Sequence, residues 1–221
     1  MQVSILSQIV GAVKAAHAGP TLLVVTASFL VALSQFSLVD AFEIAVAILA
    51  GQLIVGWSND LIDFPRDKAA GRGKKPLVTG AISVQILKRA LVIAVVVTVL
   101  LSFLSPLGLQ GTLLHMLGVL SALMYNVKLK STVLSPLPYV ISFGSLPWVI
   151  FLAAGNTPPL WLYLGFILFT TAFHFLNVLK DLQWDLDQGV LGLPQRLGRS
   201  KSIAVAIVLV SLGLAGILFL S

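Results

Sequence analysis

The chain has 221 residues, of which 58% are hydrophobic and only 10% are charged, and its mean hydropathy is +1.03. A soluble domain carries about a quarter charged residues, so this composition excludes an ordinary soluble protein and indicates an integral membrane protein. Because cysteine is absent, disulfides, thiolate metal sites and cysteine nucleophiles are excluded as well.

The first 18 residues mix apolar side chains with Gln2, Gln8, Lys14 and His17. An amphipathic helix that lies in the membrane interface is one interpretation of this pattern. A loosely ordered N-terminal tail is the other, and the sequence alone leaves both open.

Seven apolar stretches follow, each close to the ~20 residues that a helix needs to cross a bilayer. In chain order they lie at roughly 21–39, 41–57, 86–104, 108–126, 133–153, 159–179 and 202–220. We therefore predict an all-α fold, a polytopic transmembrane helical bundle of about seven spans that forms a single domain over residues 1–221.

The positions of the 14 basic residues predict the orientation of the spans. The connections around Asp40, Ser105 and Asn156 contain no Lys or Arg, whereas every Lys and Arg lies in or beside the alternate connections. The positive-inside rule makes those alternate connections cytoplasmic. We expect the N-terminus inside, the C-terminus outside, and the plasma membrane of a prokaryote as the default location. The net charge of +6 then indicates a lipid bilayer, and not nucleic acid, as the partner.

A cluster of carboxylates follows the second apolar stretch. Asp60, Asp63 and Asp67 are spaced i, i+3 and i+7, so a continued helix carries them on one face. Pro65 is compatible with a helix that ends or restarts there. Carboxylates in or near a bilayer cost free energy unless they are paired, bound to metal or facing a polar cavity. The cluster therefore predicts a functional site, with a helix-capping array as the alternative.

A second cluster lies far downstream, where Asn177, Asp181 and Asp185 are spaced i, i+4 and i+8 and again predict one helical stripe. With the neighbouring Asp187, six of the eight acidic residues belong to the two clusters. Carboxylates are hard oxygen ligands and Lys and Arg bind phosphate, so the combination predicts a divalent cation that handles phosphate, with Mg²⁺ as the first candidate. The predicted metal ligands are Asp60, Asp63, Asp67, Asp181 and Asp185.

Basic residues follow each cluster. Arg72 and Lys75, in the sequence Gly-Arg-Gly-Lys-Lys-Pro, are predicted to stabilise a diphosphate leaving group. Simple positive-inside topology is the alternative for each of them.

Tyr125 and Lys128 lie where another span meets the cytoplasm, and Tyr125 is either catalytic or an interfacial belt residue. His174, one turn before Asn177, either points towards a cavity or is a hydrogen-bonded structural histidine, and we expect the latter.

The two halves of the chain share the order helix, acidic cluster and basic loop, which indicates a weak internal repeat. Two such repeats that face one another would enclose a central cavity whose polar end opens to the cytoplasmic face.

These segments resemble the UbiA superfamily of intramembrane prenyltransferases. The resemblance is carried by three matches in the right order, which are Asn59-Asp60-x-x-Asp63-x-x-x-Asp67 with the loop 71–80, Tyr125 to Lys130, and Asn177-x-x-Lys180-Asp181-x-x-x-Asp185 with the loop 189–198. Together they cover most of the chain, from about residue 15 to residue 215.

The resemblance implies an intramembrane helical fold and Mg²⁺-dependent transfer of a prenyl group from an isoprenoid diphosphate to a lipid-soluble or membrane-proximal acceptor, through an allylic carbocation. The catalytic residues it implies are Asp63, Asp181, Arg72, Lys128 and Tyr125. The substrate-binding residues it implies are Asn59, Arg72, Lys75, Asn177, Lys180, Tyr125 and Lys128. An aromatic quinone precursor is the first candidate acceptor, with a glycerol-phosphate lipid and a phosphoribose diphosphate as alternatives.

Two departures from the family accompany the resemblance. Family members usually have nine spans, so we expect a more open cavity or one that a second copy of the chain completes. The interval from Tyr125 to Lys128 is also shorter than usual, which leaves Lys128 and Lys130 as alternatives for the family's lysine.

The competing functional class is a cation-coupled transporter with the carboxylates as ion ligands. Against it, the acidic groups gather near one interface and do not form a path across the membrane.

Overall fold

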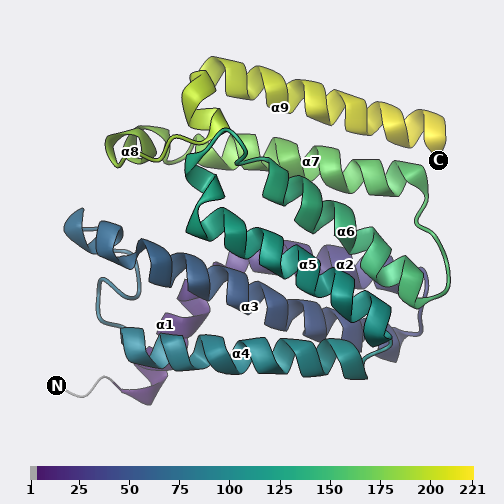
Figure 1. The fold of residues 1–221 in the computed structure, drawn as a ribbon, viewed down its shortest axis with the longest axis horizontal. Coiled ribbons are helices and arrows are strands. Elements are labelled where there is room, and N and C mark those ends of the chain that lie inside the picture. Colours follow the sequence, from purple (N-terminus) through teal and green to yellow (C-terminus); the bar gives the residue numbers. More distant parts are fainter. Residues whose placement is uncertain (1–3) are drawn as a thin grey trace. The chain divides into compact units, whose positions relative to one another are not determined.

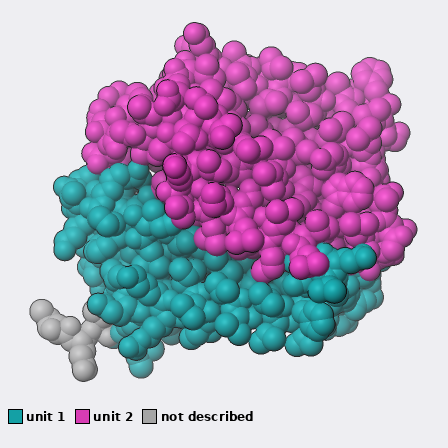
Figure 2. Space-filling model, in the orientation of Figure 1, with its two compact units in different colours: residues 1–112 teal, residues 113–221 magenta. Residues whose placement is uncertain are grey.

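The structure is a computed structural model that describes residues 4–221, and all regular structure in that range is helical, as predicted (Figure 1). The described chain divides between Thr112 and Leu113 into two compact units (Figure 2), a division that falls inside helix α5. Each unit contains one of the two acidic clusters.

The first unit contains α1 (Ile5–Ala15), α2 (Ala18–Leu33), α3 (Leu38–Ala69) and α4 (Val84–Leu104). Serine side chains cap three of these helices: Ser4, Ser37 and Ser83 each accept a hydrogen bond at 3.2 Å from the backbone N–H three residues on. Helix α3 packs against both α2 and α4 (Figure 1). It is therefore the central helix of this unit and the element that positions the first acidic cluster.

Helices α1 and α2 meet at a 65° bend. The bend is made by His17, whose φ of 53° and ψ of 61° lie in the left-handed region. Apolar side chains along α1 are exposed, with Ile5 at 79% and Leu6 at 71%. A short amphipathic helix set at an angle to a longer apolar one is the geometry of an interfacial helix. That location stays a prediction, and residues 1–3 of the predicted segment lie outside the described residues.

The second unit contains most of α5 (Gly108–Val127), a 3₁₀ turn η1 (Leu129–Ser131), α6 (Leu137–Ala153), α7 (Leu160–Val178), α8 (Leu182–Asp187) and α9 (Leu193–Leu220). Helix α7 packs against α6 and α9. The approach of α9 to α7 is close, because a Cβ on Gly213 would lie 2.9 Å from the ring of Phe169. Such contacts through small residues are the usual way in which membrane helices pack.

Each of the seven predicted spans coincides with a helix, and five of these helices are long and apolar enough to cross a membrane. Helix α2 has 16 residues and pairs with α1 as a broken span, while α6 has 17 residues. The exact number of spans therefore stays a prediction.

The predicted boundary near Asp40 was wrong. The first connection lies at residues 34–37, because Ser37 caps α3 and Asp40 belongs to the first turn of that helix.

Candidate functional site

The first acidic cluster lies at the C-terminal end of α3. Asp60, Asp63 and Asp67 are all buried, and Asp60 and Asp67 are each only 2% exposed. The predicted single helical stripe is confirmed, because α3 continues through Pro65 as far as Ala69. Asn59 is half-buried on the same helix. Buried carboxylates require compensating charges, and the segment that follows α3 provides them.

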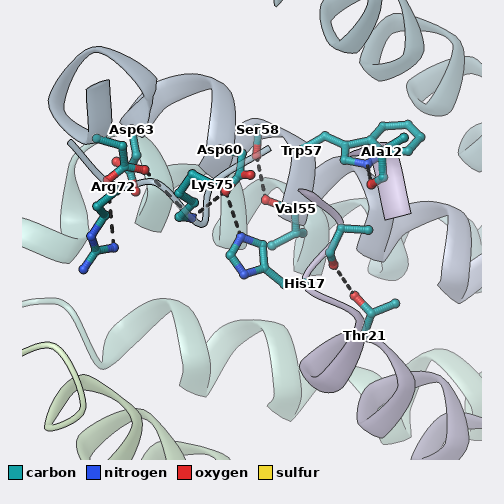
Figure 3. Close-up of polar contacts among 12 residues, drawn as sticks. Ala12, His17, Thr21, Val55, Trp57, Ser58, Asp60, Asp63, Arg72 and Lys75 are labelled. Atoms are coloured by element: carbon teal, nitrogen blue, oxygen red, sulfur yellow. Dashed lines mark hydrogen bonds and ion pairs between the residues drawn. The ribbon is translucent and has the colours of Figure 1, made fainter. Parts of the chain in front are cut away.

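The loop after α3 folds back and places two basic side chains against the cluster (Figure 3). The Lys75 Nζ lies 2.6 Å from Asp60 Oδ1 and 3.9 Å from Asp67 Oδ2. The Arg72 Nη1 lies 3.9 Å from Asp67 Oδ1. Gly71 permits this reversal because its φ of +65° is a conformation that other residues rarely adopt. The structure thus places Arg72 and Lys75 beside the carboxylates, and their predicted role at a diphosphate leaving group stays a prediction.

A third cation completes the charge balance. The Arg66 Nη2 lies 3.2 Å from Asp63 Oδ2, one helical turn away on α3. Three carboxylates thus face Arg66, Arg72 and Lys75, so the charges of the first acidic cluster nearly cancel. A site of this kind presents both signs of charge over a short distance, and this determines which ligands it can bind.

Sequence reasoning missed one member of the site. The Nε2 of His17 donates a hydrogen bond to Asp60 Oδ1 over 3.0 Å, across 43 positions of sequence. The carboxylate can only accept, so this nitrogen carries the proton. His17 is also the only residue other than glycine with positive φ in the described chain. A sequence gives no direct sign of such a conformation, and His17 stood in a segment for which a loosely ordered tail was one interpretation.

The second cluster is arranged differently from the prediction. Helix α7 ends at Val178, and Asp181 has a φ of −115° and precedes the separate short helix α8, which carries Asp185. The single stripe through Asn177, Asp181 and Asp185 was therefore wrong. Helix α8 is held by a contact from α9, in which Gln195 Nε2 donates a hydrogen bond to Asp185 Oδ2 over 2.9 Å. Asp181 is exposed, whereas Asp185 is half-buried.

The remaining predicted residues of the second unit lie near its polar end. The exposed Lys180 donates from Nζ to Asn177 Oδ1 over 3.1 Å, which pairs two predicted substrate-binding residues. Lys128 is exposed and immediately precedes η1. Tyr125 lies on α5, with its ring centroid 5.5 Å from that of Tyr139 in an edge-to-face contact. Tyr125 is thus part of an aromatic cluster inside the second unit.

His174 is held at the same cluster. Its Nε2 lies 3.2 Å from Ser135 Oγ, and that hydroxyl also accepts a hydrogen bond at 3.0 Å from the backbone N–H of Leu193. The ring of His174 lies 4.5 Å from Tyr139. These contacts are what we expect of a hydrogen-bonded structural histidine, and they tie α7 to the start of α9.

Within residues 4–221, no three His, Asp or Glu side chains lie close enough together to form a ready-made metal site. The structure gathers Asp60, Asp63 and Asp67 with their cations, and the helix break after Val178 separates Asn177 from Asp181 and Asp185, which lie one turn apart at the start of α8. The five predicted metal ligands are therefore not a preassembled cage, and metal binding by them stays a prediction.

Comparisons with known proteins agree with this architecture. The model of the UbiA prenyltransferase family matches residues 20–221. The fold is similar to the apo structure of a UbiA homologue from Aeropyrum pernix K1, with a TM-score of 0.76 and 22% identity over 89% of this chain and 76% of that chain. A UbiA homologue from Archaeoglobus fulgidus bound to GPP and Mg²⁺ has a TM-score of 0.81 at 14% identity, over 95% of this chain and 77% of that chain.

A digeranylgeranylglyceryl phosphate synthase is also similar in fold, with a TM-score of 0.73 at 18% identity over 95% of this chain and 76% of that chain. A comparison with curated protein sequences found no match. The family model covers nearly the whole chain, and the apolar helices agree with a family of membrane proteins. The chain therefore belongs to the UbiA prenyltransferase family and is an integral membrane prenyltransferase.

Proposed function

We propose that the protein uses Mg²⁺ to transfer a prenyl group from a prenyl diphosphate to a membrane-soluble acceptor. The observation that carries this proposal is the close alternation of buried carboxylates and cations in the first acidic cluster. The Archaeoglobus fulgidus homologue with GPP and Mg²⁺ supports the donor class and the metal. We propose that an aromatic quinone precursor is the acceptor, ahead of the glycerol-phosphate and phosphoribose classes.

The charge balance favours a metal–diphosphate ligand over a bare cation. A bare cation entering the cluster would meet Arg66, Arg72 and Lys75 at close range, and like charges repel strongly where water is scarce. A diphosphate that arrives with Mg²⁺ carries both signs. The Mg²⁺ ion would bind the carboxylates, and the diphosphate oxygens would accept hydrogen bonds from the three cations. One ligand would thus pair with both the acidic and the basic residues of the site. This argument also weighs against a cation-coupled transporter.

The state of Asp67 supports metal binding at the first acidic cluster. Its Oδ1 is buried and accepts no hydrogen bond from any described residue, although the Arg72 guanidinium lies 3.9 Å away. A buried carboxylate oxygen without a hydrogen-bond donor is unfavourable unless a cation binds it. Mg²⁺ usually takes only one or two carboxylates and completes its shell with water and phosphate oxygens. Asp67, with Asp63 beside it, therefore suffices to begin such a site.

The departing diphosphate must have its developing negative charge neutralised, and this sets the role of the basic residues. The bond between the prenyl carbon and the diphosphate oxygen breaks, and the diphosphate leaves with the electron pair. Mg²⁺ supplies part of the charge neutralisation when bound, and we propose that Arg72 and Lys75 supply the rest through hydrogen bonds that strengthen as negative charge develops. The acceptor then attacks the allylic cation and loses a proton.

We propose that the second cluster takes part in the same reaction. Asp181 and Asp185 would bind Mg²⁺, and Asn177 and Lys180 would bind the donor, with Tyr125 and Lys128 assisting. The exposure of Asp181 leaves it accessible to a ligand. The orientation proposed for these residues is cytoplasmic, because every Lys and Arg lies in or beside the connections of that side.

A ligand-stabilisation experiment tests the donor and metal assignments without requiring the acceptor. The purified protein in detergent is heated with geranylgeranyl thiodiphosphate, with and without Mg²⁺. A ligand that binds only the native state raises stability, by about 2.7 kcal/mol at a hundredfold excess over Kd. We expect stabilisation only when Mg²⁺ is present. No stabilisation with this or with shorter and longer chains would overturn the proposal and favour the transporter.

Replacing Arg72 with alanine should weaken donor binding about tenfold. The guanidinium lies beside Asp67 and is only partly exposed, so its loss removes a charge-assisted hydrogen bond to diphosphate. Titration of the thiodiphosphate at saturating Mg²⁺ measures the change. The exposed Lys74, in the same loop, provides the matched control as Lys74→Ala. Equal affinities of both variants and the natural protein would show that Arg72 is only a topology signal.

A further inference from the structure

We infer that His17 is a positioning residue for the diphosphate site, and that Asp60 serves to hold Lys75 in place and does not bind Mg²⁺. The inference rests on the proposed function, since it divides the work among the residues of the first acidic cluster. It assigns a role to a residue at the start of the chain, outside both aspartate segments.

Asp60 and Asp67, at the two ends of the first acidic cluster, differ in the hydrogen bonds that they accept. Asp60 Oδ1 accepts from His17 Nε2 at 3.0 Å and from Lys75 Nζ at 2.6 Å, which fills the two lone-pair positions of that oxygen. Asp67 is equally buried, but both of its nearest cations are 3.9 Å away and its Oδ1 accepts no hydrogen bond from the described residues. Asp67 Oδ1 is therefore available to coordinate a metal. Asp60 Oδ1 is not, because it already accepts hydrogen bonds from two protein donors.

Lys75 is the residue that benefits from this arrangement. An ammonium group has three N–H donors on a flexible four-carbon stem, so its position is poorly defined unless a partner holds it. Asp60 uses one donor and leaves two for phosphate oxygens. The Lys75 side chain is 20% exposed, so a ligand can reach it. By donating to the same Asp60 oxygen that accepts from Lys75, His17 fixes the point at which Lys75 is held (Figure 3).

The chain holds His17 in place through several contacts around the bend. A Cβ on Gly56 of α3 would lie 2.8 Å from Ala16, so only glycine allows the bend to approach so closely. Thr21 Oγ1 donates to the Ala16 carbonyl over 2.7 Å, and Trp57 Nε1 donates to the Ala12 carbonyl over 2.9 Å (Figure 3). The close approach at Gly56 and the Thr21 hydrogen bond hold His17 in its left-handed conformation, which a residue other than glycine adopts only when its surroundings impose it. The Trp57 hydrogen bond instead ties α1 to α3.

Replacing His17 with glycine removes the imidazole and keeps the bend, because glycine adopts a positive φ readily. We expect the Kd for geranylgeranyl thiodiphosphate at saturating Mg²⁺ to rise roughly tenfold, as for the loss of one hydrogen bond to a charged group. The melting temperature without ligand should change little. His17→Asn tolerates the same φ and keeps a side-chain N–H, so it should recover part of the affinity.

A double-mutant cycle shows whether His17 acts through Asp60. In an Asp60→Asn background, His17→Gly should have no further effect on Kd, because the charged carboxylate through which His17 would act on Lys75 is already gone. The half-saturating Mg²⁺ concentration should rise for Asp67→Asn and stay unchanged for Asp60→Asn. Trp57→Phe is the control for α1, since it removes the hydrogen bond to Ala12 without touching Asp60. It should lower the melting temperature and leave Kd unchanged.

Separate outcomes would overturn the inference and the proposed function. If His17→Gly binds the thiodiphosphate as tightly as the natural protein, or if its effect adds fully to that of Asp60→Asn, His17 does not position the site. If Asp60→Asn raises the Mg²⁺ requirement, Asp60 is a metal ligand after all. If the natural protein itself fails to bind the thiodiphosphate with Mg²⁺, the proposed function fails instead.

Discussion

Replacing Asp63 with asparagine is expected to slow prenyl transfer by roughly 10²–10³-fold while the protein stays folded. Asp63 is buried in the middle of the acidic stripe and pairs with Arg66 at 3.2 Å. Asparagine keeps the volume of the side chain and removes the negative charge that would attract Mg²⁺. The donor diphosphate then loses charge compensation mainly in the transition state, when its own negative charge is largest.

The measurement is diphosphate release from a labelled prenyl diphosphate, with a lipid extract as the source of acceptor. Asp40→Asn is the matched control, because Asp40 lies on the same helix but in its first turn, far along α3 from the cluster. We expect that variant to keep the natural rate. An active Asp63→Asn protein with an unchanged Mg²⁺ requirement would remove Asp63 from the metal site.

Replacing Gly56 with alanine is expected to destabilise the protein by about 1–3 kcal/mol. The added Cβ would lie 2.8 Å from three backbone atoms of Ala16, and backbone cannot move aside as a flexible side chain can. The bend would shift away from α3, so the hydrogen bond between His17 and Asp60 would lengthen. The variant should therefore lose both thermal stability and donor affinity.

Thermal melting with and without the thiodiphosphate checks this expectation. Gly19→Ala is the matched control, since Gly19 lies at the start of α2 and a Cβ there meets nothing within 4 Å. That change should be neutral or slightly stabilising, because alanine favours helix. A Gly56→Ala protein as stable as the Gly19→Ala protein would show that the bend adapts freely.

The difference between the two acidic clusters shows what helical spacing can predict. Asp60, Asp63 and Asp67 were placed correctly because α3 has tertiary support on two sides and stays helical through Pro65. The second cluster has equally regular spacing, and no Gly or Pro lies between Asn177 and Asp185. Its helix nevertheless ends at Val178. After the break, α8 is held by a hydrogen bond from Gln195 of α9 to Asp185, a contact that local spacing does not contain.

The same limit explains why His17 was missed. The aspartates and Lys75 are close in sequence and share a readable charge pattern, whereas His17 reaches Asp60 across 43 positions. Its approach depends on Gly56, whose importance appears only when Ala16 is seen against it. The helices themselves could be predicted well, because long apolar runs restrict the choice of structure in a membrane. The connection that carries His17 is not subject to that restriction.

The length of α3 determines the depth at which the first acidic cluster lies in the membrane. Its 32 residues extend about 48 Å, whereas the hydrocarbon layer of a bilayer is about 30 Å thick. If the N-terminal end of α3 lies at the far interface, the segment with Asp60 and Asp67 extends beyond the hydrocarbon and into the headgroup layer. A prenyl diphosphate dissolved in the leaflet already holds its charged end at that level. The substrate can then react without leaving the lipid, and its chain stays solvated by hydrocarbon throughout.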